Sequence, residues 1–79
     1  MSEASSANEY THEEQKAALD EVFDSLWFPS GEVRRNVYIS YKMNMFLLVQ
    51  YAISNGIDVL EHIRSIKQVL LKDGTAYEY

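Results

Sequence analysis

The spacing of apolar residues in the first third of the chain predicts an amphipathic helix. Its large apolar side chains recur at steps of three or four residues, which places them on one helical face. They are Leu19, Val22, Phe23, Leu26 and Trp27. Thr11 and Glu14 have the spacing of a capping box, in which each side chain bonds the other residue's backbone N–H. Because Pro29 disfavours helix in the residue before it, we expect a helix over residues 11–27.

The next segment, residues 34–42, has an alternating pattern. Its apolar positions Val37, Ile39 and Tyr41 are separated by single intervening residues, and β-branched and aromatic side chains dominate. This period of two is typical of a half-buried strand. We therefore predict a short strand over residues 35–41.

A continuous helix over residues 32–54 is the alternative for this segment. Apolar residues also occur at helical steps, with the larger ones at positions 33, 37, 41, 45 and 48. A strand here gives a mainly α fold with one short β-strand, in which a helix precedes a β-α-α unit. A helix here gives an all-α three-helix bundle.

Residues 44–55 are expected to form a helix that is apolar almost all round. Gln50 and Ser54 mark only a narrow polar line, and Gly56 suits a left-handed cap at its end. A soluble helix of this kind must be covered on several sides. A chain of 79 residues, 47% of them hydrophobic, has little material for that cover, so we expect an intertwined homodimer.

A last helix is expected over residues 58–72, because Asp58 and Glu61 repeat the capping-box spacing and Gly74 follows Lys72 as a cap. The domain then comprises residues 11–74. Residues 1–10 are expected to be a disordered lead-in, and residues 75–79 a short tail.

Composition narrows the class of protein. The chain has no cysteine, which removes disulfides and the common zinc patterns. No stretch reaches the ~18 apolar residues that a membrane helix needs, and residues 1–8 are polar without being basic. We expect a cytoplasmic protein without a membrane partner.

Charge is divided unevenly along the chain. Residues 1–28 have a net charge of −6, residues 29–72 of +3 and residues 73–79 of −2, within a total of −5. Such an asymmetry indicates two surfaces with different roles, or else a solvated acidic helix beside an ordinary mixed surface.

The junction around Gly56 resembles that between the two helices of the ribbon-helix-helix family of small dimeric DNA-binding proteins. Ala52 precedes Gly56 by four residues, Asp58 provides a cap, and residues 61–64 (Glu-His-Ile-Arg) open the second helix. The resemblance covers residues 34–72, although in this chain an acidic helix comes before the ribbon segment.

The resemblance implies binding to duplex DNA. Two strands, one from each subunit, would pair into a ribbon that enters the major groove. The residues facing the bases would be Asn36, Tyr38 and Ser40. The residues contacting phosphate would be Arg34, Arg35 and Lys42. The acidic helix would then bind a protein or shield the ribbon.

The alternative function is that of an all-helical interaction protein or inhibitor that does not bind DNA. Its acidic first helix would dock on a basic partner or imitate the charge of nucleic acid. The residues of that surface would be Glu13, Asp20, Glu21 and Asp24.

Neither interpretation involves catalysis or a cofactor. The chain has no nucleophile elbow and no Gly-rich phosphate loop. Its two histidines, His12 and His62, lack the further ligands of a metal site, since Asp58 is the sole acid near His62 at helical spacing.

Overall fold

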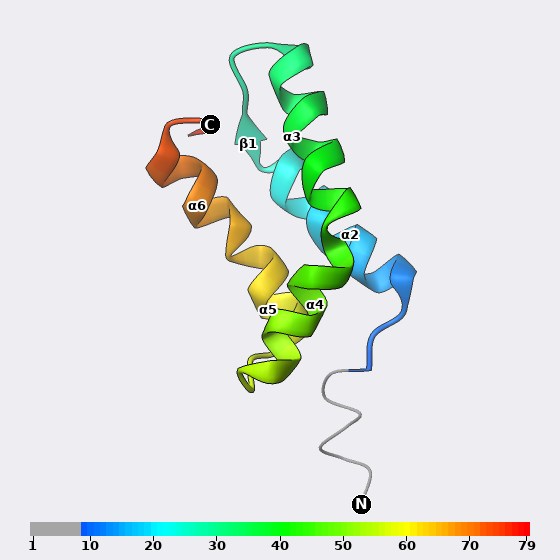
Figure 1. Ribbon diagram of the computed structural model, residues 1–79. Coiled ribbons are helices and arrows are strands. Elements are labelled where there is room, and N and C mark those ends of the chain that lie inside the picture. The colour runs from blue at the N-terminus through cyan, green and yellow to red at the C-terminus, as the bar shows by residue number, and fades with distance from the viewer. Residues whose placement is uncertain (1–8) are drawn as a thin grey trace, which may run out of the picture.

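The computed structural model describes residues 9–79, which form a mainly α fold with one small sheet. Helices α3 and α4 form one arm, α5 and α6 form a second, and α2 crosses behind the first (Figure 1). The elements, in order, are α2 (His12–Asp24), β1 (Leu26–Trp27), α3 (Gly31–Met43), α4 (Met45–Ser54), α5 (Val59–Arg64), α6 (Ile66–Asp73) and β2 (Tyr77–Glu78).

Helix α2 begins with the predicted capping box, which is confirmed. The Thr11 hydroxyl accepts a 3.0 Å hydrogen bond from the Glu14 N–H, and the Glu14 carboxylate accepts a 2.8 Å bond from the Thr11 N–H. The helix ends earlier than residue 27, at Asp24. Leu26 and Trp27 form strand β1 instead.

The predicted strand over residues 35–41 is wrong, because this segment lies within α3. Ser30 caps the helix by accepting a 3.1 Å hydrogen bond from the Val33 N–H. Val33, Val37 and Tyr41 then share one helical face and pack against the core. The β-α-α order implied by the ribbon-helix-helix resemblance is therefore not observed.

Side-chain directions in α3 also differ from those of the predicted strand. Ile39, expected in the core, is exposed, whereas Tyr38, expected to face bases, packs against the core. In a helix, residues 38 and 41 share a face with residues 34 and 37, while residue 39 points away from them.

Helices α3 and α4 nearly form the continuous helix of the alternative interpretation. They are separated at Asn44, whose side-chain amide donates a 2.9 Å hydrogen bond to the Ser40 carbonyl. The Leu48 N–H still bonds the Asn44 carbonyl at 3.0 Å. The two helices therefore extend one arm across the break.

Gly56 and Asp58 form the turn after α4, as predicted. Gly56 has a φ of 67°, and the Ile57 N–H bonds the Ala52 carbonyl at 2.8 Å, which closes the end of α4. Asp58 accepts a 3.1 Å hydrogen bond from the Glu61 N–H and so caps α5.

The helix predicted over residues 58–72 is divided at Ser65. The Ser65 hydroxyl donates a 2.6 Å hydrogen bond to the His62 carbonyl, and α6 starts at the next residue. A hydroxyl that bonds a preceding carbonyl competes with the helical ladder and bends it. Gly74 closes α6 with a φ of 75°.

Both segments expected to flank the domain take part in it. Residues 75–79 contain β2, which pairs with β1 in antiparallel register, Leu26 opposite Glu78 and Trp27 opposite Tyr77. At the other end, the Tyr10 hydroxyl donates a 2.6 Å hydrogen bond to Asp58. The remaining residues of the expected lead-in, 1–8, lie outside the described part of the chain.

The core is built mainly by α2, α5 and α6. The largest fully buried side chains are Phe23, Leu19, Leu26, Ile63 and Val59. Helix α3 contains no fully buried residue, and α4 contributes Ala52 alone. The α3–α4 arm is thus covered on one side only. Among residues 9–79, no helix is long and apolar enough to cross a membrane.

Candidate protein-interaction surface

The acidic residues predicted as an interaction surface on α2 are mostly engaged within the chain. Asp24 pairs with Arg34 at 3.0 Å, and Glu21 lies 3.6 Å from Arg64. These pairs join α2 to α3 and α5, so the negative charge of α2 is partly balanced by basic residues that follow later in the sequence.

Asp20 is the most strongly held of these acids. It accepts hydrogen bonds from the Tyr38 hydroxyl at 2.5 Å and from the Lys16 ammonium at 3.1 Å. The bond from Tyr38 is the main reason why the pKa of Asp20 is lowered, and it raises the pKa of Tyr38 in return. Of the four predicted acids, only Glu13 makes no ion pair with another described residue.

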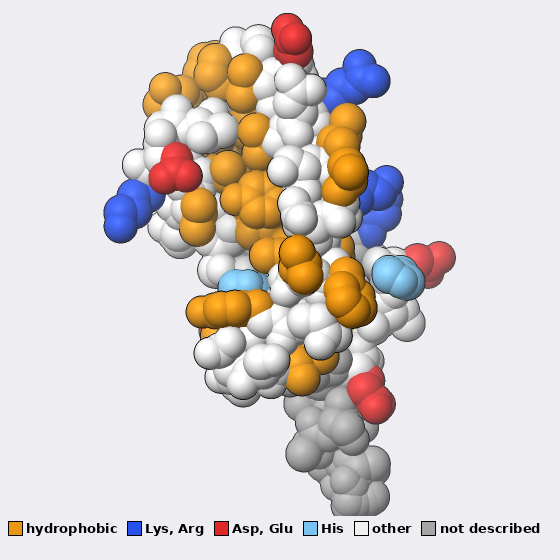
Figure 2. All heavy atoms as spheres, viewed as in Figure 1, with side chains coloured by type: hydrophobic (Ala, Val, Ile, Leu, Met, Phe, Trp, Pro, Cys, Tyr) orange, Lys and Arg blue, Asp and Glu red, His pale blue; other side chains and the backbone are white. Residues whose placement is uncertain are grey.

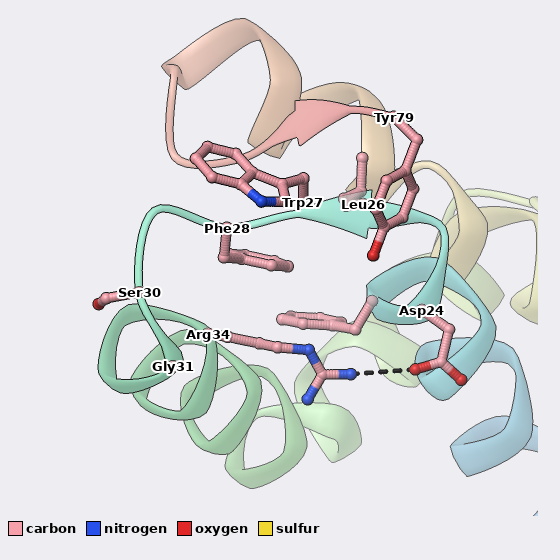
Figure 3. A pocket seen from close by; sticks show the side chains of 9 residues that line it. Asp24, Leu26, Trp27, Phe28, Ser30, Gly31, Arg34 and Tyr79 are labelled. Atoms are coloured by element: carbon pink, nitrogen blue, oxygen red, sulfur yellow. Dashed lines mark hydrogen bonds and ion pairs between the residues drawn. The ribbon is translucent and has the colours of Figure 1, made fainter.

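Two of the residues predicted to bind DNA also have structural roles. The Arg34 guanidinium lies 5.9 Å from the centre of the Phe23 ring and reaches Asp24, as the dashed line in Figure 3 marks. It borders a pocket of about 210 Å³ beside Phe28, Trp27 and Tyr79. Tyr38 is held by Asp20 and meets the Phe23 ring edge-on, with ring centres 5.3 Å apart.

The other four predicted DNA-binding residues are exposed along α3. They are Arg35, Asn36, Ser40 and Lys42. Because the segment is a helix and contributes no strand, the two-stranded ribbon that gave all six residues their predicted roles has no counterpart in this chain.

A different surface lies on the outer side of the α3–α4 arm. It consists of large apolar side chains whose exposed fractions run from 40% to 79%. We call it the α4 surface, and its residues are Ile39, Met43, Phe46, Leu47, Tyr51 and Ile53. Figure 2 shows hydrophobic side chains gathered over α4, with histidine side chains to either side.

No charge interrupts the part of this surface that runs from Met43 to Ile53. Between Lys42 and Asp58 the sequence has no Asp, Glu, Lys, Arg or His. Exposed apolar area of this extent, bordered by polar residues, marks an interaction site in soluble proteins. Such a surface can bind a complementary apolar face.

Two shallow grooves flank α4. One, of about 350 Å³, is lined by Asn44, Leu47, Leu48, Tyr51 and His62. In it the rings of Tyr51 and His62 stack with centres 5.1 Å apart. The other, of about 430 Å³, lies between α2 and the α3–α4 junction. It is lined by His12, Lys16, Leu19, Lys42, Met43, Met45 and Phe46.

The sequence predicted that α4 is apolar almost all round, but it did not single out the α4 surface as a site. The run of uncharged residues after Lys42 was the feature of the sequence that could have indicated this surface. Which of its apolar residues point outward depends on how α4 lies against α5, and periodicity along a helix that is apolar on every face does not determine that. Among the described residues, no cluster of His, Asp and Glu is arranged to hold a metal ion.

Comparisons with protein-family models, with curated proteins and with solved structures found no match for this chain.

Proposed function

We propose that this chain is a protein-interaction module that works as a homodimer joined through the α4 surface. The observation that carries the proposal is the row of exposed apolar side chains along α4 and the end of α3, which no charged residue interrupts between Met43 and Ile53. Met43, Phe46 and Leu47 are the most exposed among them. This choice follows the all-helical alternative, because residues 34–42 form a helix.

The size of the core supports a second copy as the occupant. A domain of this length buries only about 60% of the surface that its unfolded chain exposes, and such domains often need a partner subunit. Here α3 has no fully buried residue and α4 has one, Ala52. A second α3–α4 arm would cover the side of these helices that the rest of the chain leaves open.

The area of the surface also fits a dimer. At roughly 200 Å² for a fully exposed large side chain, the exposed fractions of the six residues amount to roughly 700 Å². A standard stable interface buries about 800 Å² per partner.

Charge supports self-association as well. Net charge is −5, but none of it lies between Lys42 and Asp58. Two copies can therefore bring their α4 helices together without placing like charges opposite each other in the centre of the interface. An isologous pairing uses the same patch on both subunits, as this arrangement does.

The test is the mass of the protein in solution. Sedimentation equilibrium of the wild type should give twice the 9.2 kDa chain mass at micromolar concentration, and Leu47→Glu should give the single-chain mass. Leu47 is mostly exposed, so this substitution should leave the subunit folded, as a circular dichroism spectrum can check. Gln68→Glu is the matched control, because it adds the same charge at an exposed position of α6.

A monomeric wild type at 100-fold higher concentration would overturn the proposal. So would a Leu47→Glu variant with the mass of a dimer, because the interface would then lie elsewhere. A dimeric Gln68→Glu variant beside a monomeric Leu47→Glu variant is the result that the proposal requires.

A further inference from the structure

The groove between α2 and the α3–α4 junction combines an apolar floor with basic side chains. Its floor is formed by Leu19, Met43, Met45 and Phe46. Lys16 and His12 lie one helical turn apart on the α2 wall, and Lys42 lies on the opposite wall. A chain with a net charge of −5 thus carries a locally basic groove that no acidic side chain lines.

The lysines on the two walls are in different situations. Lys16 binds Asp20 at 3.1 Å, and this contact raises the pKa of Lys16. Lys42 makes no ion pair with a described residue. Asp20 also accepts a hydrogen bond from the Tyr38 hydroxyl, and the charge of Lys42 helps to lower the pKa of Asp20 from beyond ion-pair distance.

We propose that this groove binds an anionic amphiphile, a molecule with a single carboxylate or sulfate head and an unbranched alkyl chain. The alkyl chain would lie on Leu19, Met45 and Phe46, and the head would lie between Lys16 and Lys42. Small-molecule sites are typically 300–1,000 Å³ in volume and mainly apolar, with a few polar groups that orient the ligand. The groove, at about 430 Å³, has this size and composition.

The two methionines suit such a ligand. A methionine side chain has three rotatable bonds and adapts its shape to an apolar neighbour. Met43 and Met45 can therefore close on an alkyl chain without movement of the backbone. Met43 is largely exposed in the single subunit, and covering it with an alkyl chain would bury apolar area that faces water there.

Each subunit forms the whole groove, so the proposal does not rest on dimerisation, although Met43 and Phe46 also belong to the α4 surface. Binding should therefore occur in the monomeric Leu47→Glu variant, at least as tightly as in the wild type, in which a partner subunit would compete for Met43 and Phe46. Leu47 lines the other groove and does not touch this one.

The experiment is calorimetric titration with decanoate, well below the concentration at which it forms micelles. Three further compounds are titrated for comparison: decanol, which lacks the negative charge, acetate, which lacks the alkyl chain, and decyltrimethylammonium, which has the opposite charge. We expect saturable binding of decanoate and at least tenfold weaker binding of the other three. The double variant Lys16→Gln/Lys42→Gln should bind decanoate about tenfold more weakly, since it loses two charge contacts. Lys72→Gln, at an exposed position of α6, is the control and should bind like the wild type.

Methyl chemical shifts locate the ligand. Met43 and Met45 should shift on addition of decanoate, whereas Ile66 in the core should not. Equal affinity for decanol and decanoate, or an unchanged affinity in the double lysine variant, would overturn the proposal. Binding only to the dimer, or only of an acidic peptide in place of decanoate, would also overturn it, while the mass measurement would still decide on dimerisation by itself.

Discussion

The Tyr38 hydroxyl donates a 2.5 Å hydrogen bond to Oδ1 of Asp20, a residue 18 positions earlier in the chain. The bond joins α3 to α2 beside the edge-on contact between the Tyr38 and Phe23 rings. In the predicted strand Tyr38 would have faced a ligand, whereas in the helix it forms part of the link between α2 and α3. Asp20, on α2, provides the acceptor of the same hydrogen bond.

Removing this hydroxyl should weaken the fold in a defined way. Tyr38→Phe keeps the ring contact with Phe23 but takes away the donor, and we expect a loss of about 1 kcal/mol in the free energy of unfolding. Urea denaturation measures it. Tyr41→Phe on the same helix is the control, because the Tyr41 hydroxyl makes no hydrogen bond with a described residue. An equal loss in both variants would mean that the bond to Asp20 contributes nothing.

The same hydrogen bond makes the stability of the fold depend on pH in the acidic range. The pKa of Asp20 is lowered in the folded protein, chiefly by the Tyr38 hydroxyl. A lowered pKa contributes stability that is present above the unfolded-state value of about 3.9 and is lost as pH falls through the folded-state pKa. Between pH 5 and pH 2, Tyr38→Phe should therefore lose less stability than the wild type. A parallel pair of curves would contradict this.

A second carboxylate gives an independent comparison. Tyr10 donates a 2.6 Å hydrogen bond to Asp58, and this bond is the main cause of the lowered pKa of Asp58. Tyr10→Phe should raise the pKa of Asp58 and leave that of Asp20 unchanged, while Tyr38→Phe should do the reverse. Carbon-detected titration of the two carboxyl groups separates these outcomes. A shift of both groups in either variant would indicate a general loosening of the fold.

Gly56, in the turn after α4, and Gly31, at the start of α3, offer a matched pair of glycine substitutions. Gly56 has a φ of 67° with open space around its Cα, so Gly56→Ala should cost about 1 kcal/mol through backbone conformation alone. Gly31, in the first turn of α3, also has open space but no positive φ. Gly31→Ala should be neutral or stabilising by up to about 1 kcal/mol. Thermal unfolding of both variants checks the difference, and equal effects would contradict it.

The elements predicted correctly from the sequence depend on contacts within a few residues. The Thr11–Glu14 capping box, the cap at Asp58 and the left-handed Gly56 each arise from atoms three to five positions apart. Such interactions are available to a short segment before the rest of the chain is in place. The sequence by itself therefore determined where α2 and α5 begin and where α4 ends.

Tertiary structure decided the rest. Val37 and Tyr41 satisfy a period of two and a helical period equally, and the helix is the arrangement in which Tyr38 and Tyr41 both meet the Phe23 ring and Tyr38 bonds Asp20. Strands β1 and β2 pair across some 50 residues, a contact that no local pattern signals. Which face of α4 points outward is likewise determined by the residues of the rest of the chain that pack on its inner face. These features depend on residues far apart in the sequence, so they become defined only when α2, α3 and α5 share one core.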